Sequence, residues 1–121
     1  MAEIVGEKGK VTGIEIVPEL KEFGEKNLAK YKTNGVAKII LGDGSKGYKK
    51  EAPYDKILAS ASTGKIPEAW KEQLKVDGRL VAPVGNSIRL LVKKPFDATQ
   101  GKSEFEEYEY PGFVFVPLIE T

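Results

Sequence analysis

The sequence predicts an α/β fold built on a mainly parallel, doubly wound sheet. Strand and helix signals alternate through the first two thirds of the 121 residues and are joined by short loops, which is the order that parallel sheets require. The last third contains strand signals joined directly by turns, and such strands pair antiparallel. The sequence shows neither an internal repeat nor an interdomain linker, so we expect one domain over residues 1–121.

The first strand is predicted over residues 10–15 and is followed by a helix that opens at Pro18, a favoured first helical position. Asn34-Gly35 is expected to end this helix, and a second strand begins near Val36. One helix face is predicted to be apolar, through Leu20, Phe23, Leu28 and Tyr31.

A third strand is predicted over residues 54–60, followed by a short helix that opens at Pro67. A turn at residues 76–78 leads to a fourth strand, residues 79–84. Ile66, Trp70 and Leu74 recur on one face of the short helix and are expected in the core.

The C-terminal third is expected to form an antiparallel hairpin region at one edge of the sheet. Its predicted strands cover residues 87–94, 104–110 and 113–118. A polar loop is expected over residues 95–102, and a turn at Pro111-Gly112.

The composition is that of an ordered globular protein, with 40% hydrophobic and 31% charged residues. Nineteen basic side chains nearly balance eighteen acidic ones, which argues against binding to nucleic acid or to an anionic membrane. The sequence contains no apolar stretch of membrane-spanning length and no secretory signal at its N-terminus, so we expect a cytoplasmic protein.

Cysteine and histidine are both absent from the sequence. Thiolate nucleophiles, cysteine-ligated zinc and histidine bases are therefore excluded, and we predict no metal site. The remaining chemistry is of the kind that a bound cofactor and accurate positioning perform.

Two predicted strands end in an acid. Glu15 ends the first strand, and Asp43 follows the second between Gly42 and Gly44. Ligands of open α/β sheets bind beyond the carboxyl ends of the strands, where an acid can hold the hydroxyls of a ribose. The alternatives are a solvated acid for Glu15 and an ordinary turn for Asp43.

Hydroxyl side chains follow the third strand at Ser60, Ser62 and Thr63. They are weak candidates for catalytic residues, since hydroxyl-rich loops are usually only loops. Lys46, Lys49 and Lys50 form a small basic cluster, which we interpret as a solvated loop rather than a phosphate site.

Several blocks of sequence occur in a specific order and spacing. They are residues 9–15 with 18–20, 40–48, 52–57, 66–67 with 72–74, 78–85, and 113–118. In these blocks the chain resembles the protein-L-isoaspartate O-methyltransferase family, and the likeness runs nearly end to end.

The resemblance implies a Rossmann-like methyltransferase sheet and S-adenosylmethionine as cofactor. Glu15 would bond both ribose hydroxyls and Asp43 would accept from the adenine amine, so the predicted cofactor-binding residues are Glu15, Ile16, Gly42, Asp43 and Gly44. Ser60, Ser62 and Thr63 would face the transferred methyl group and the substrate carboxylate. The implied reaction methylates isoaspartyl carboxylates of damaged proteins.

The sequence departs from the family at its N-terminal side. The family's first central strand, its glycine-rich cofactor loop and most of its substrate-binding elements would lie before Met1, and residues 60–65 also differ from the usual small-residue run. Without that strand, the strands at 10–15 and 54–60 are expected to leave unpaired edges.

Three ways of closing this gap follow: direct pairing of the two strands, dimerisation, or a separately encoded N-terminal half. We therefore predict an oligomer or a partner, and we expect the isolated chain to be inactive. The alternative function is a non-catalytic remnant that acts as a binding or interaction module.

Overall fold

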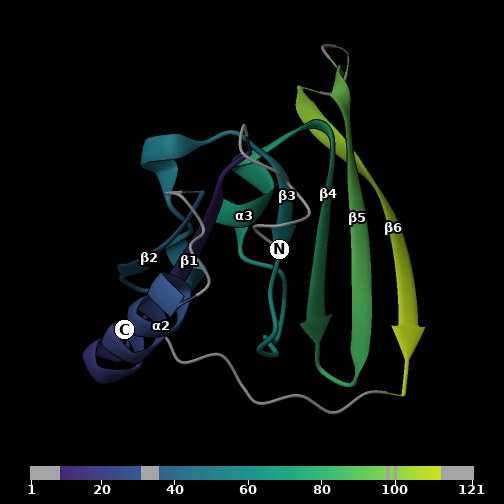
Figure 1. Cartoon of the computed structure of the whole chain (residues 1–121). Coiled ribbons are helices and arrows are strands. Elements are labelled where there is room, and N and C mark those ends of the chain that lie inside the picture. The colour runs from purple at the N-terminus through teal and green to yellow at the C-terminus, as the bar shows by residue number, and fades with distance from the viewer. Residues whose placement is uncertain (1–8, 31–35, 98, 100, 113–121) are drawn as a thin grey trace. The chain divides into compact units, whose positions relative to one another are not determined.

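The computed structural model describes residues 9–30, 36–97, 99 and 101–112 (Figure 1). Their contacts divide the chain into two compact units that meet in sequence between Gly44 and Ser45. Each unit is described by itself, and the single domain over residues 1–121 stays a prediction. Within these ranges, every helix is too short or too polar to cross a membrane.

The first unit is a β-α-β element, as predicted. It contains β1 (Val11–Glu15), α2 (Pro18–Lys30) and β2 (Ala37–Leu41). The two strands are parallel and in continuous register from Val11 opposite Ala37 to Glu15 opposite Leu41. Helix α2 begins at Pro18, the residue from which the sequence predicted it.

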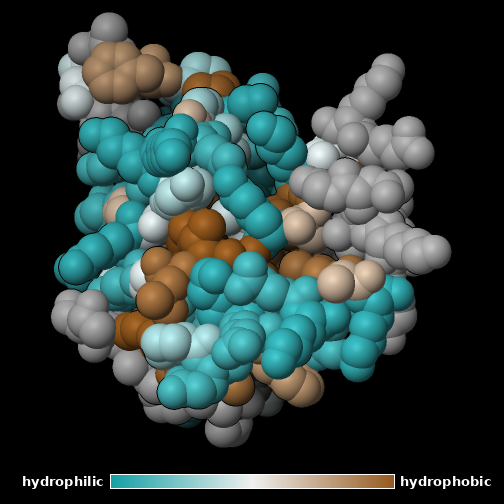
Figure 2. Space-filling model, turned by 60° about the vertical axis from the view of Figure 1, so that its left-hand side comes forward, coloured by the Kyte–Doolittle hydropathy of each residue, from teal (hydrophilic) through white to brown (hydrophobic). Residues whose placement is uncertain are grey.

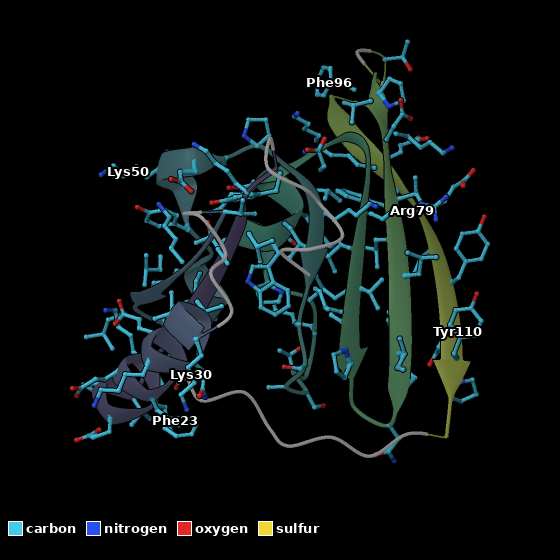
Figure 3. The ribbon with its side chains drawn as sticks, in the orientation of Figure 1. Phe23, Lys30, Lys50, Arg79, Phe96 and Tyr110 are labelled. Carbon is cyan, nitrogen blue, oxygen red and sulfur yellow. The ribbon has the colours of Figure 1, made fainter. Side chains whose placement is uncertain are left out.

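The contact between α2 and β2 is made through a small residue. A Cβ atom on Gly24 would lie 2.5 Å from Cδ1 of Ile39, so the helix approaches the strand where it carries no side chain. The predicted apolar face is not buried at two positions, since Leu20 and Phe23 are 55% and 64% exposed. Figure 3 labels Phe23 on the surface of α2.

The second unit is a four-stranded mixed sheet with the order β3-β4-β5-β6, and Figure 1 shows the long strands β4, β5 and β6 side by side. Strands β3 and β4 are parallel, whereas β4, β5 and β6 are antiparallel, so the predicted hairpin region is confirmed. The elements are β3 (Tyr54–Leu58), α3 (Glu68–Glu72), β4 (Leu74–Val84), β5 (Ser87–Asp97) and β6 (Lys102–Pro111), with short 3-10 helices η1 (Gly44–Lys46) and η2 (Lys49–Glu51) before β3.

The core of this unit lies where α3 covers β4. Trp70, Leu74 and Leu80 are 5%, 1% and 0% exposed, which confirms the predicted core role of Trp70 and Leu74. The other buried members are Ile66, Ala82, Val84 and Leu91.

Two predicted boundaries in this unit are wrong. Residues 76–78 do not form a turn before β4 but a bulge within it, where the pairing with β3 shifts and Asp77 has a φ of 66°. Residues 95–97 continue β5 rather than starting a loop, because a second register shift between Lys93 and Phe96 accommodates Pro95, which lacks an N–H.

Strands β1 and β3 belong to different sheets in the part of the chain that the structure describes. Direct pairing of these two strands, one of the predicted ways of closing a gap, stays a prediction. The predicted helix end at Asn34-Gly35 and the predicted strand at 113–118 lie outside the described residues.

Candidate cofactor site

The two acid-bearing strand ends meet at the same edge of the first unit. Glu15 is the last residue of β1 and lies opposite Leu41, the last residue of β2. The amide of Gly42 then donates a 3.0 Å hydrogen bond to the carbonyl oxygen of Glu15. The parallel pairing thus continues to the point from which the side chains of the predicted site arise.

The carboxylate of Glu15 is held at the start of α2. Its Oε1 accepts a 3.1 Å hydrogen bond from the amide of Val17. The carbonyl oxygen of Val17 in turn accepts from the amides of Leu20 and Lys21, at 3.1 and 3.0 Å. The acid therefore lies at the positive end of the helix, which favours a negative charge, and a carboxylate retains capacity for further hydrogen bonds.

Residues 42–44 connect β2 to η1, and all three are half-buried. A Cβ atom on Gly42 would make only an ordinary contact of 3.8 Å with Ile14, and one on Gly44 would meet no atom of the described structure within 4 Å. The backbone beside Asp43 is therefore open enough for a flat ring to approach. Ile16, the remaining predicted residue, lies half-buried in the bend between β1 and α2.

The three hydroxyl candidates differ in their surroundings. Ser60 is exposed, whereas Ser62 donates a 3.2 Å hydrogen bond to the carbonyl oxygen of Gly85. Thr63 is 8% exposed and forms a parallel bridge with Val84, and its Oγ1 has no partner among the described residues. Only Ser60 among the three offers an exposed hydroxyl to a substrate.

The lysines of the predicted basic cluster lie on the two short 3-10 helices before β3. Lys46, Lys49 and Lys50 are exposed, and Figure 3 shows Lys50 directed outward from η2.

Gln73, to which the sequence pattern assigns no role, binds the loop after η1 through its side chain. Its Oε1 accepts from the amide of Tyr48 at 2.9 Å, and its Nε2 donates to the carbonyl oxygen of Lys46 at 3.0 Å. The available signal was the position of a polar residue directly beside Leu74, at the end of a helix that packs on the core.

Two solved structures share this fold. One is a protein-L-isoaspartate O-methyltransferase, with a TM-score of 0.84 and 24% identity over 98% of this chain and 37% of that chain. The other is a putative protein-L-isoaspartate O-methyltransferase from Plasmodium falciparum in complex with S-adenosyl-L-homocysteine, with a TM-score of 0.75 and 22% identity over 93% of this chain and 53% of that chain. They confirm the predicted Rossmann-like α/β fold.

The family model for protein-L-isoaspartate(D-aspartate) O-methyltransferase matches residues 1–121. The chain belongs to this family, as its sequence blocks predicted.

Curated relatives support the assignment. Over 121 residues the chain is 43% identical to the protein-L-isoaspartate O-methyltransferase of Methanothrix thermoacetophila, covering 98% of this chain and 54% of the relative. A protein-L-isoaspartate O-methyltransferase 2 of Archaeoglobus fulgidus is 52% identical over 91 residues, covering 75% of this chain and 41% of the relative. The chain thus spans about half the length of the curated relatives it matches.

Proposed function

We propose that this chain forms the ribose- and adenine-binding part of a protein-L-isoaspartate O-methyltransferase. The main support for this proposal is the hydrogen bond from the amide of Gly42 to the carbonyl oxygen of Glu15, which brings the ends of β1 and β2 together at one edge. In this proposal Glu15 accepts from the two ribose hydroxyls and Asp43 accepts from the exocyclic adenine amine. Ile16, Gly42 and Gly44 lie beside the nucleoside.

The two acids fit S-adenosylmethionine. A carboxylate accepts two hydrogen bonds at once, as a ribose diol requires. When bound, the cofactor supplies a methyl group on a sulfonium, which an isoaspartyl carboxylate oxygen attacks to give a methyl ester and S-adenosylhomocysteine. The reaction depends on alignment rather than on a strong base, so the absence of histidine does not oppose it.

The substrate side of the proposal rests on Ser60. Its exposed hydroxyl follows β3, at the carboxyl edge where ligands of such sheets bind. Ser62 and Thr63 are weaker candidates, because Ser62 is bonded to Gly85 and Thr63 is buried. An isoaspartyl-containing peptide or protein is the proposed substrate.

We propose further that the chain acts in the cytoplasm together with a second copy or another polypeptide. Strand β1 pairs with β2 on one side, and within the described ranges its other edge takes part in no ladder. A strand edge that takes part in no ladder can accept an additional strand.

A methyl-transfer assay tests this proposal. The chain is incubated with radiolabelled S-adenosylmethionine and either an isoaspartyl peptide or its normal aspartyl counterpart. The assay is repeated with the part of the Methanothrix thermoacetophila relative that the chain does not match. We expect base-labile label on the isoaspartyl peptide in the complemented mixture and none on the aspartyl peptide. No label in that mixture, despite a complex in sedimentation, would contradict the enzymatic proposal.

The second candidate is a non-catalytic interaction module. Large apolar side chains are exposed in both units, and Figure 2 shows hydrophobic residues at the surface. Those of the first unit are Leu20, Phe23 and Leu41, at 55%, 64% and 52% exposure. Binding of a partner without binding of S-adenosylhomocysteine would favour this candidate over the enzyme.

A further inference from the structure

We propose that Gln73 is a positioning residue for cofactor selectivity, because it fixes the loop that continues from the adenine-side acid Asp43. This inference rests on the proposed function. It concerns a buried amide that neither the family match nor the sequence pattern assigns to the site.

The side-chain amide of Gln73 makes two hydrogen bonds to the backbone of the loop. The side chain is 8% exposed, and it both donates to the carbonyl oxygen of Lys46 at 3.0 Å and accepts from the amide of Tyr48 at 2.9 Å. Both ends of the amide are therefore engaged with the two residues that flank Gly47. Buried polar groups are retained where such bonds are satisfied, and a single-ended replacement leaves an unpaired group.

Gly47 permits this approach. Its φ of 64° lies in the left-handed region, and a Cβ atom there would lie 2.2 Å from Oε1 of Gln73. A side chain at this position would displace the amide. The loop and Gln73 therefore depend on each other.

A second anchor comes from β3. The hydroxyl of Tyr54 donates to the carbonyl oxygen of Tyr48, and the amide of Tyr54 donates to the carbonyl oxygen of Gln73 at 2.7 Å. The loop is thus tied to the start of β3 and to the residue before β4. These are elements of the sheet rather than mobile surface groups.

The link to Asp43 is covalent. Lys46 is the last residue of η1, whose first residue, Gly44, directly follows Asp43. Fixing the carbonyl group of Lys46 limits the conformations of the short helix and of the acid before it. A site whose supporting residues are fixed loses less entropy on binding and keeps its geometry.

The experiment compares two ligands that differ at the adenine amine. Calorimetry measures the affinities of the chain for S-adenosylhomocysteine and for its inosine analogue, in which a carbonyl oxygen replaces the amine. The wild type is expected to prefer the adenine ligand by roughly tenfold or more, as for a hydrogen bond to a charged acceptor. In Gln73→Met, which keeps the length but loses both hydrogen bonds, the ratio of affinities is expected to fall toward one.

The ratio of the two ligand affinities distinguishes a loss of positioning at the adenine amine from a general loss of stability. Partial unfolding lowers both affinities by the same factor and leaves their ratio unchanged. Gln73→Glu keeps the oxygen that accepts from the amide of Tyr48. Its ratio of adenine-ligand to inosine-ligand affinity is expected to lie between those of the wild type and Gln73→Met. This variant therefore supplies a readout if Gln73→Met does not fold. Asn86→Met, an amide lost from the exposed turn between β4 and β5, is expected to keep the wild-type ratio.

The outcomes are distinct. Wild-type selectivity that persists in Gln73→Met and Gln73→Glu overturns the role of Gln73 and leaves the proposed function intact. A wild type that binds neither ligand overturns both. A wild type that binds both equally overturns the role of Asp43 and, with it, the positioning role of Gln73.

Discussion

The backbone amide of Gly42 donates a 3.0 Å hydrogen bond to the carbonyl oxygen of Glu15, and this bond joins the ends of two parallel strands. Because the strands are in register up to Leu41, the residues after β1 and after β2 emerge at one edge. The relationship places the two acids through the backbone of the two strand ends. It depends on the packing of α2 against β2, which leads to the first prediction.

Gly24→Ala is expected to stabilise the chain by less than the about 1 kcal/mol by which alanine favours helices over glycine. The added Cβ would lie 2.5 Å from Cδ1 of Ile39, the end of a flexible side chain, which must shift to make room. Thermal unfolding monitored by circular dichroism measures the effect. Ile39→Val removes the obstructing methyl group, so Gly24→Ala is expected to be more stabilising in that background. Equal effects in the two backgrounds would contradict the contact.

Gly47→Ala is expected to cost more stability than Gly101→Ala. Both glycines have a positive φ, 64° and 68°, so both substitutions introduce about 1 kcal/mol of backbone strain. Only at Gly47 does the new Cβ also meet the side chain of Gln73, because Gly101 has no described atom within 4 Å. Urea denaturation of the two variants gives the comparison. Equal losses would show that the loop has no close contact with Gln73.

Leu80→Ala is expected to cost about 2–5 kcal/mol of unfolding free energy, the range for a buried leucine. Leu80 is fully buried beneath α3, so its removal leaves a cavity beside Trp70. The matched control is Leu58→Ala, on the neighbouring strand and 60% exposed, for which the loss is expected to be much smaller. Urea denaturation followed by tryptophan fluorescence reports both. Similar losses would place the core elsewhere.

The ion pair between Lys94 and Glu106 is expected to shift the titration of both groups. Their side chains are 2.9 Å apart across β5 and β6, and the hydrogen bond from Lys94 lowers the pKa of Glu106 and raises that of Lys94. A lowered carboxyl pKa gives stability that is present above its unfolded pKa and is lost as the pH falls through the folded pKa. NMR titration should show Glu106 titrating at lower pH than in Lys94→Gln. An unchanged midpoint in the variant would contradict the pairing.

The β-α-β element and the antiparallel region could be predicted because their signals are local. Pro18 marks a helix start, and turns between strands impose antiparallel pairing. The exposure of Leu20 and Phe23 could not be predicted from helical spacing, because the approach of α2 is set by Gly24 and the shape of Ile39. Periodicity shows that residues share a face and not which face is buried.

The part of the candidate site that could be predicted also depends on local signals. Glu15 and Asp43 follow strands, and the meeting of parallel strand ends is a rule of topology. The role of Gln73 depends on two hydrogen bonds, across 25 and 27 residues, to Tyr48 and Lys46, and its position beside Leu74 does not reveal these partners. The two bulges, at residues 76–78 and near Pro95, likewise arise from the pairing of distant strands.

Calorimetric titration of the chain with S-adenosylhomocysteine tests the central claim most directly. We predict that the wild type and Glu19→Ala, which loses an exposed acid from the first turn of α2, bind one ligand per chain. Glu15→Ala is predicted to bind at least roughly tenfold more weakly, because hydrogen bonds to a charged group are lost. Equal affinity of Glu15→Ala and the wild type, or no binding by the wild type, would contradict the account.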